Sequence, residues 1–140
     1  MLKVYIIMAS KYIDIRTVKF FMNSVQELEK ILNKERFIDH NNESIDLYID
    51  SVKKFADREL FPYFKEMDEK PAYYKDGSIH VHKQVEKMMK EGGAMGLISA
   101  PFNYEDGGLQ LPLIVHTAAN YILDAANNHL PGYSGLTSGA

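Results

Sequence analysis

At residues 96–112 the sequence reads GLISAPFNYEDGGLQLP, and this stretch places the strictest demands on the backbone. Pro101 fixes its own φ and disfavours the helical conformation at Ala100, so a helix does not continue through this point. Gly107 and Gly108 permit positive φ and a close approach of two backbone segments. Helix-like apolar spacing stands on both sides of the stretch. We therefore expect an ordered loop that joins two helices.

Apolar residues on both sides of this loop recur at three- and four-residue steps, which predicts amphipathic helices. The following helix is expected over residues 111–128, and a further one begins near Tyr133. The preceding helix is expected over residues 82–95, and it ends at Gly92-Gly93 or Gly96 in the left-handed conformation. The apolar face over residues 111–128 is formed by Ile114, Val115, Ala118, Tyr121, Ile122 and Ala125.

Two more helices are expected ahead of residue 70. The longest covers residues 43–67, where Pro62 should kink or reset the last turns. The other covers residues 24–32 with Ser24 as its N-cap, and a short turn or helix over residues 15–22 precedes it. Residues 70–77 contain a proline and an Asp-Gly pair, which indicate a loop. Because the only strand-like runs, residues 4–8 and 79–81, are short, the predicted fold class is an all-α helical bundle.

Composition restricts the class of protein. The 140 residues, with 46% hydrophobic and 25% charged, fit one soluble domain. A net charge of −3 argues against a nucleic-acid partner, and the lack of a basic recognition helix argues against a DNA-binding helix-turn-helix protein. The lack of cysteine excludes disulfides and zinc–cysteine sites and fits a cytoplasmic location. No window reaches the roughly 18 apolar residues of a membrane span. Residues 1–7 are too short an apolar run for a signal peptide, and Met8 is a better start than Met1.

Residue chemistry alone predicts no catalytic group and no metal site. His80 and His82 are the only close histidine pair, and no motif supplies the further ligands that a metal needs. We therefore interpret both as part of a surface connection. The serines lack the Gly-x-Ser-x-Gly context of an activated nucleophile. The glycines of residues 92–96 lack the strand and the Gly-Lys-Ser/Thr of a phosphate loop, which favours a helix end.

Three motifs occur in a fixed order. VKKFADRELFPYFKEMDE (52–69) has Glu59, Leu60 and Pro62 in an E-(L/I)-x-P pattern; VEKMMKEGGAMGLISAP (85–101) and YEDGGLQL (104–111) follow. In this order and spacing they resemble the N-terminal helical domain of acyl-CoA dehydrogenases, over residues 44–140. Two departures stand out. Gln110 replaces the third glycine of the family's loop, and residues 121–122 replace an acidic pair that many members carry.

The resemblance implies an oxidoreductase of fatty-acid metabolism. Family members consist of an N-terminal helical domain, a middle β-domain and a C-terminal bundle, and they α,β-desaturate acyl-CoA thioesters with FAD. The glutamate base lies on the C-terminal bundle, and most flavin contacts lie in the last two domains. The resemblance therefore predicts a fragment that is inactive alone and binds no FAD. Residues 1–42 would be an N-terminal extension with one or two short helices, similar to the longer bacterial members, and 43–140 the incomplete family domain.

The same resemblance suggests a substrate-binding set. By position, Tyr133, Gly135, Leu136 and Thr137 would border the acyl chain of the acyl-CoA substrate, with the tyrosine supplying contact area and one hydroxyl. The alternative is that Tyr133 and Leu136 anchor the next helix. A detached domain should expose an apolar surface that favours self-association, whereas the alternative function, a stand-alone helical protein-interaction module without enzymatic activity, should have a closed polar surface.

Overall fold

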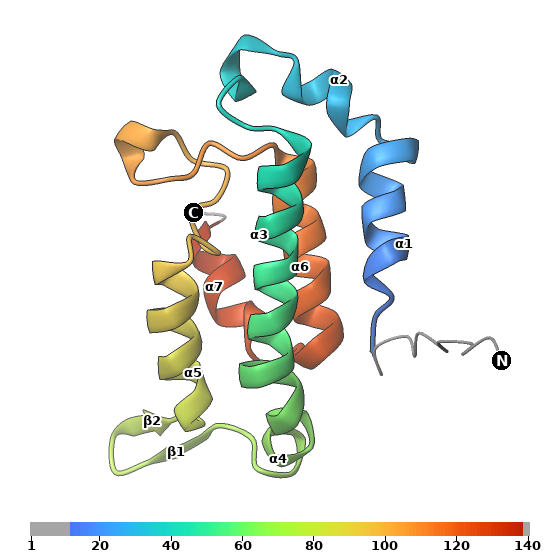
Figure 1. Ribbon diagram of the computed structural model, residues 1–140. Coiled ribbons are helices and arrows are strands. Elements are labelled where there is room, and N and C mark those ends of the chain that lie inside the picture. Colours follow the sequence, from blue (N-terminus) through green and yellow to red (C-terminus); the bar gives the residue numbers. More distant parts are fainter. Residues whose placement is uncertain (1–11, 139–140) are drawn as a thin grey trace, which may run out of the picture.

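The computed structural model describes residues 12–138, and it is mostly helical (Figure 1). At its centre α3 (Asn42–Phe55) lies beside α6 (Leu113–Asn127), and the two helices run in the same direction. Their contact is fully apolar at its core, where Ile49, Val52, Val115 and Ile122 have no exposed surface. The strand-like run at residues 4–8 and the start at Met8 lie outside the described residues.

The other elements surround this pair. Ahead of α3 come α1 (Ile15–Phe20), the π-helical turn η1 (Phe21–Val25), α2 (Leu28–Leu32) and the 3-10 turn η2 (Glu35–Phe37). After α3 come the π-helical turn η3 (Ala56–Leu60), the 3-10 turn η4 (Phe61–Tyr63), α4 (Phe64–Glu69) and the strands β1 (Tyr73–Lys75) and β2 (Ser78–His80). Then follow α5 (Lys83–Lys87), the π-helical turn η5 (Met88–Gly92), the 3-10 turn η6 (Tyr104–Asp106), α6 and α7 (Pro131–Ser138). Buried apolar residues from α1 through α6 form one core.

The predicted long helix over residues 43–67 is present in a modified form. It begins at a reciprocal cap, in which Asn41 Oδ1 accepts from the Ser44 backbone N–H and Ser44 Oγ accepts from that of Asn41. Regular α-helix ends at Phe55, and the chain passes through η3 and η4 before α4. Pro62 lies in η4, where its missing N–H costs no α-helical hydrogen bond, so the expected reset of the last turns is confirmed.

Ser24 is not the N-cap that the sequence predicted. It lies inside η1, which continues α1 to Val25 without a break. The next helix begins three residues later, after Glu27, whose φ of 52° places it in the left-handed region. This sharp turn brings Leu28 and Leu32 into the core. Burial of two leucines, rather than a local cap, therefore sets this helix start.

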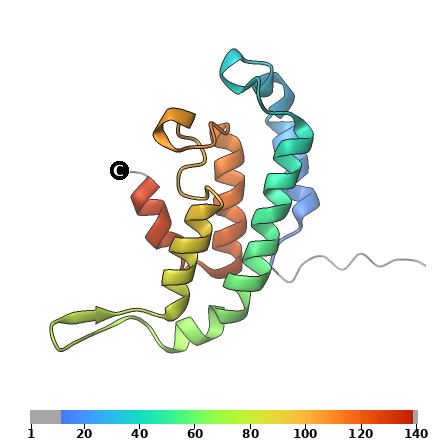
Figure 2. The ribbon, with the colours of Figure 1, turned by 60° about the vertical axis from the view of Figure 1, so that its left-hand side comes forward.

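The all-α prediction misses a small β-hairpin. Strands β1 and β2 pair antiparallel with Tyr73 opposite His80, and the hairpin projects from the helical body (Figure 2). Asp76 and Gly77 both have positive φ, 51° and 82°, which is the backbone pattern of a type I′ hairpin turn. The Asp-Gly pair predicts only a loop from the sequence; the structure adds two flanking strands that are three residues long and exposed.

The loop at residues 96–112 adopts the conformation that its glycines and proline predict. Gly96 ends the helical segment with a φ of 74°, and Gly107 has a φ of 75°. Gly108 packs so closely that an added Cβ would lie 2.2 Å from the Phe102 carbonyl oxygen. Gln110 adopts a φ of 49°, and its Nε2 donates to the Arg36 carbonyl at 2.7 Å. This hydrogen bond helps to hold Gln110 in a left-handed conformation that glycine adopts more readily.

Within residues 12–138, no helix combines the length and the apolarity that crossing a lipid bilayer requires.

Candidate functional site

The four residues predicted to border an acyl chain belong to α7, and a buried asparagine fixes where this helix starts. Asn127, at the end of α6, has no exposed surface. Its Nδ2 donates to the Leu60 carbonyl at 3.1 Å, and its Oδ1 accepts from the His129 backbone N–H at 3.1 Å. Leu130 is fully buried in the turn that follows. The direction of α7 is therefore set by a satisfied polar anchor on η3 together with one leucine.

Within α7, Leu136 is exposed and Ser134 is buried. Ser134 faces inward, where its Oγ donates to the Pro131 carbonyl at 3.1 Å. Tyr133 and Leu136 face outward, and Leu136 is 83% exposed, so it does not anchor the helix. A Cβ added to Gly135 would meet no atom within 4 Å. Thr137 is in the last turn of α7, and its side chain lies outside the described part. The structure thus places Tyr133 and Leu136 one turn apart on the same side of α7, whereas Gly135 does not share the face of Tyr133.

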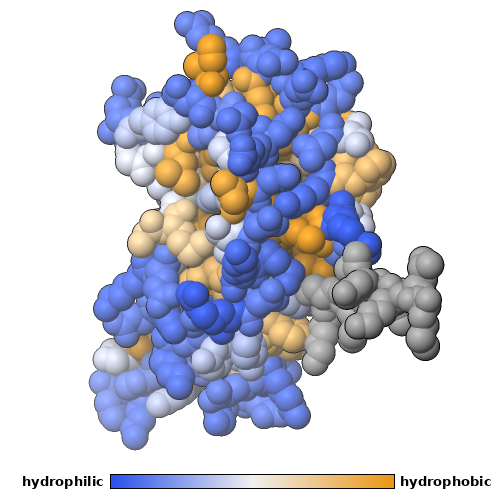
Figure 3. All heavy atoms as spheres, in the orientation of Figure 1, coloured by the Kyte–Doolittle hydropathy of each residue, from blue (hydrophilic) through white to orange (hydrophobic). Residues whose placement is uncertain are grey.

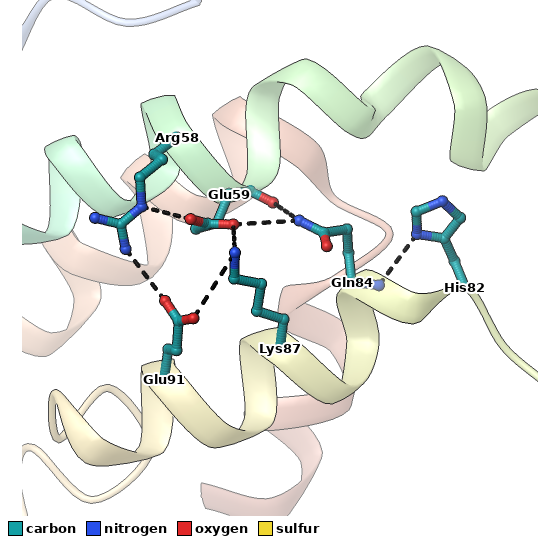
Figure 4. A network of polar contacts seen from close by, with 6 residues as sticks. All are labelled: Arg58, Glu59, His82, Gln84, Lys87 and Glu91. Carbon is teal, nitrogen blue, oxygen red and sulfur yellow. Dashed lines mark hydrogen bonds and ion pairs between the residues drawn. The ribbon is translucent and has the colours of Figure 1, made fainter.

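A second polar centre, which sequence reasoning did not assign, joins η3 to α5 (Figure 4). Glu59 is only 5% exposed, and its carboxylate accepts from Arg58 and from Lys87 Nζ, the latter at 2.7 Å. Gln84, also buried, donates its Nε2 to the Glu59 carbonyl at 2.9 Å. Glu91 completes the network, with Arg58 at 3.1 Å and Lys87 at 3.8 Å. We call these five residues the Glu59 cluster.

The charges of the Glu59 cluster suit a structural contact between η3 and α5, which we call the clamp, better than acid–base catalysis. Burial acts to raise the pKa of Glu59, but hydrogen bonds from Lys87, Arg58 and Gln84 outweigh it, so the pKa lies below its usual value. A carboxylate held ionised by three donors is a weak base and has no proton to give at neutral pH. The arrangement therefore serves to hold α5 against η3.

One sequence signal could have revealed this cluster. Glu59 continues the buried series Val52, Phe55 and Ala56 at helical spacing, so it is a charged residue on an apolar stripe. A charge at such a position needs a partner, because an isolated buried carboxylate is strongly unfavourable. The sequence does not indicate which cation supplies it, since Lys87 is 28 positions away.

Tyr48 of α3 and His116 of α6 are two of the side chains with a buried polar atom that makes no hydrogen bond within the described residues. The atoms are Tyr48 Oη and His116 Nδ1. Burial raises the pKa of Tyr48 to about 12 and lowers that of His116. His116 Nε2 lies 3.0 Å from Asn120 Nδ2. Both side chains are therefore favoured in their neutral forms by the fold.

The histidine pair is part of a surface connection, as the sequence predicted. His80 lies on the exposed β2, where its ring stacks on Tyr73 at 4.9 Å between centroids. His82 caps α5, and its Nδ1 accepts from the Gln84 backbone N–H. Among the described residues, no three His, Asp or Glu side chains converge to hold a metal ion.

An apolar groove separates α1 and η1 from α6, and the sequence did not predict it. Its volume is about 550 Å³, and apolar residues reach the surface along α1 (Figure 3). Tyr121, predicted on the apolar face of α6, is 60% exposed and lines this groove instead of the core. None of the described residues that line it is charged; they include Val18, Phe21, Met22, Leu113, Ile114 and Tyr121.

Comparisons with protein-family models, with curated proteins and with solved structures give no match to this chain. The interpretation of its sites therefore depends on its own residues and geometry.

Proposed function

We propose that this chain is the N-terminal, substrate-side helical domain of an FAD-dependent acyl-CoA dehydrogenase, which α,β-desaturates acyl-CoA thioesters, and that it is inactive alone. The observation that supports this most is the exposed side chain of Leu136 on α7. Leu136 is almost fully exposed directly after a turn that Asn127 and Leu130 lock in place. A rigidly placed apolar side chain beside an uncrowded glycine suits contact with an alkyl chain or with a neighbouring domain.

The order of elements gives further support. The residues of the E-(L/I)-x-P pattern occupy η3 and η4, where the long helix changes its winding. The glycine-rich loop then joins the α5–η5 helix to α6. In this proposal Tyr133 and Leu136 would provide one wall of the acyl pocket, and Gly135 would leave room for the chain.

The proposal expects no FAD to bind within these residues. A pyrophosphate needs cations or a cradle of backbone N–H groups, and the lining of the large groove contains no charged residue among those described. The cations of the Glu59 cluster are occupied by Glu59 and Glu91. The proposal therefore assigns FAD contacts and the catalytic base to other domains, and no reaction step to these residues.

The test is a comparison of the product of the complete gene with this chain. The complete product is expected to be yellow, to bleach when acyl-CoA is added without oxygen, and to oxidise acyl-CoA with an artificial electron acceptor. This chain is expected to be colourless and inactive. A complete product that neither binds flavin nor oxidises any acyl-CoA would contradict the proposal.

A substitution in the complete product tests the role of α7. Leu136→Trp is expected to raise KM for long acyl-CoAs more than for short ones, because the larger ring takes space along the chain. Tyr74→Trp on the hairpin is the matched control, because Tyr74 is 73% exposed. It should leave KM unchanged for long and for short acyl-CoAs.

The alternative, a stand-alone protein-interaction module, is expected to have a closed polar surface outside its binding site, and the hairpin would be that site. The projecting hairpin exposes Tyr73, Tyr74 and Ile79, and an isolated two-stranded hairpin gains little stability in water by itself. An exposed aromatic hairpin of this kind suits a protein partner. A colourless complete product that loses a binding partner on Tyr74→Ser would favour this function.

A further inference from the structure

The apolar groove between α1–η1 and α6 has the shape of an unfinished helix–helix contact. The two helical segments run antiparallel, with the groove between them (Figure 1). On α6 the outward positions Leu113, Thr117 and Tyr121 follow a four-residue step, and on α1–η1 Thr17, Phe21 and Val25 do the same. Each set is a ridge that can enter the groove between two other helices. The surface thus contains two ridges and one groove.

The apolar area of this surface is large enough for a specific interface. The four large side chains along its ridges are between 53% and 68% exposed: Phe21, Val25, Leu113 and Tyr121. Large side chains have roughly 150–250 Å² to bury, so together these four expose roughly 400 Å². Two copies in contact remove roughly twice that area from water, and the threonines of the same ridges bring the total to on the order of 1,000 Å², the area at which specific interfaces begin.

A second copy of this chain fits the surface better than a charged partner does. A two-fold axis brings the same patch of both copies together, so each ridge meets the other copy's groove. Because the described lining is uncharged, the groove itself brings no charge into the contact. Within the hairpin, neighbouring residues such as Tyr73 and Tyr74 point to opposite faces of the strand, so their two rings do not form one continuous patch.

We infer that two copies of this chain associate through the groove between α1–η1 and α6, with Phe21 and Tyr121 of each copy inserted against the other. The contact is a symmetric helical interface, and its residues are different from those of α7 on which the proposed function depends. Most of its binding free energy comes from the two aromatic side chains, as is usual at the centre of an interface.

Sedimentation velocity of the 140-residue chain at increasing concentration tests this inference. The chain is expected to shift from monomer to dimer. Tyr121→Glu is expected to weaken the dimer by about tenfold or more, because the carboxylate is either buried unpaired or keeps the surfaces apart. Phe21→Glu, on the other ridge, is expected to act alike. Tyr74→Glu on the hairpin is the matched control and should leave the dimer unchanged.

The outcomes that would overturn the inference are distinct. A wild-type chain that stays monomeric at every concentration excludes the dimer. A dimer that survives both Tyr121→Glu and Phe21→Glu but dissociates with Tyr74→Glu assigns the contact to the hairpin. Circular dichroism verifies that each variant is folded, and if Phe21→Glu unfolds, Phe21→Ser replaces it. Loss of flavin binding by the complete gene product would affect the proposed function alone.

Discussion

The central pair α3–α6 is flanked by α5 on one side and by α1 on the other, and the contacts on these two flanks differ in kind. On the α5 flank, the Glu59 cluster closes the contact with hydrogen bonds and ion pairs, and the loop at residues 96–112 packs backbone against backbone. On the α1 flank, α1 is tied to α3 by Lys19 with Asp46 and Asp50, yet the space between α1 and α6 stays an apolar groove. Polar closure fixes one arrangement of a flank, whereas an open apolar groove leaves that flank available to a partner.

The largest loss of stability is expected at Gly108, where the α5 flank is most closely packed. Gly108→Ala places a Cβ 2.2 Å from the Phe102 carbonyl oxygen, so the loop must move. We expect a loss of about 2–3 kcal/mol in the free energy of unfolding, measured by urea denaturation. Gly132→Ala in α7 is the control, because its Cβ meets no atom within 4 Å. The control should be neutral or stabilising by up to about 0.5 kcal/mol. Equal losses in both would contradict the close packing at Gly108.

The second largest loss of stability is expected when the Glu59 carboxylate is removed. Glu59→Ala leaves Gln84 and the cations of the cluster without the buried carboxylate. We expect a loss of about 2 kcal/mol, less than for a fully buried pair because the cations can turn to water. Glu91→Gln at the rim is the control and should change stability by less than about 0.5 kcal/mol. A smaller loss at Glu59 than at Glu91 would show that burial does not strengthen this cluster.

The pH dependence of the clamp has a defined sign. Because the pKa of Glu59 is lower when the chain is folded, its stabilisation is present above the ordinary value of 4.5. It is lost as the pH falls through the folded pKa. Thermal melts of the wild type and Glu59→Gln should therefore converge in acid. A gap between them that stays constant down to low pH would contradict a charged clamp.

His116 of α6 also makes the stability of the fold depend on pH. Its effect is expected to be weaker than that of Glu59 and to occur at higher pH. Burial lowers its pKa from 6.5, so the unfolded chain takes up a proton first. The stability that neutral His116 provides is present above 6.5 and falls as the pH drops below that value. His116→Gln should flatten this part of the pH profile, and His80→Gln on the hairpin should not. The measurement is the melting temperature at a series of pH values.

Particular residues show how far the sequence alone could lead. The loop at residues 96–112 was predictable because proline and glycine act locally, and its neighbour α6 ends one residue from its predicted limit. The hairpin was missed although Asp76-Gly77 is a known hairpin pair, because its strands bury nothing. The predicted substrate-binding residues lie together on α7, but their role stays a prediction. Tyr121 could not be assigned to a groove, since the groove exists only once α1 and α6 are placed.

The smallest expected change in stability separates folding from assembly on the open flank. Leu113 is the first residue of α6, is 68% exposed, and begins a helix whose first turn has no acidic residue. Leu113→Glu should raise the monomer's free energy of unfolding by a few tenths of a kcal/mol, about 0.3–0.5, because a carboxylate at a helix N-terminus interacts favourably with the helix dipole. The same substitution puts a charge on the ridge beside the groove, so it should weaken the dimer in sedimentation velocity. A variant that is more stable as a monomer and yet associates less would show that this leucine is retained for contact with a second copy and not for the fold. If Leu113→Glu lowered the stability of the monomer, the Leu113 side chain would contribute to the fold of the domain. The inference that it serves the contact with a second copy would then be contradicted.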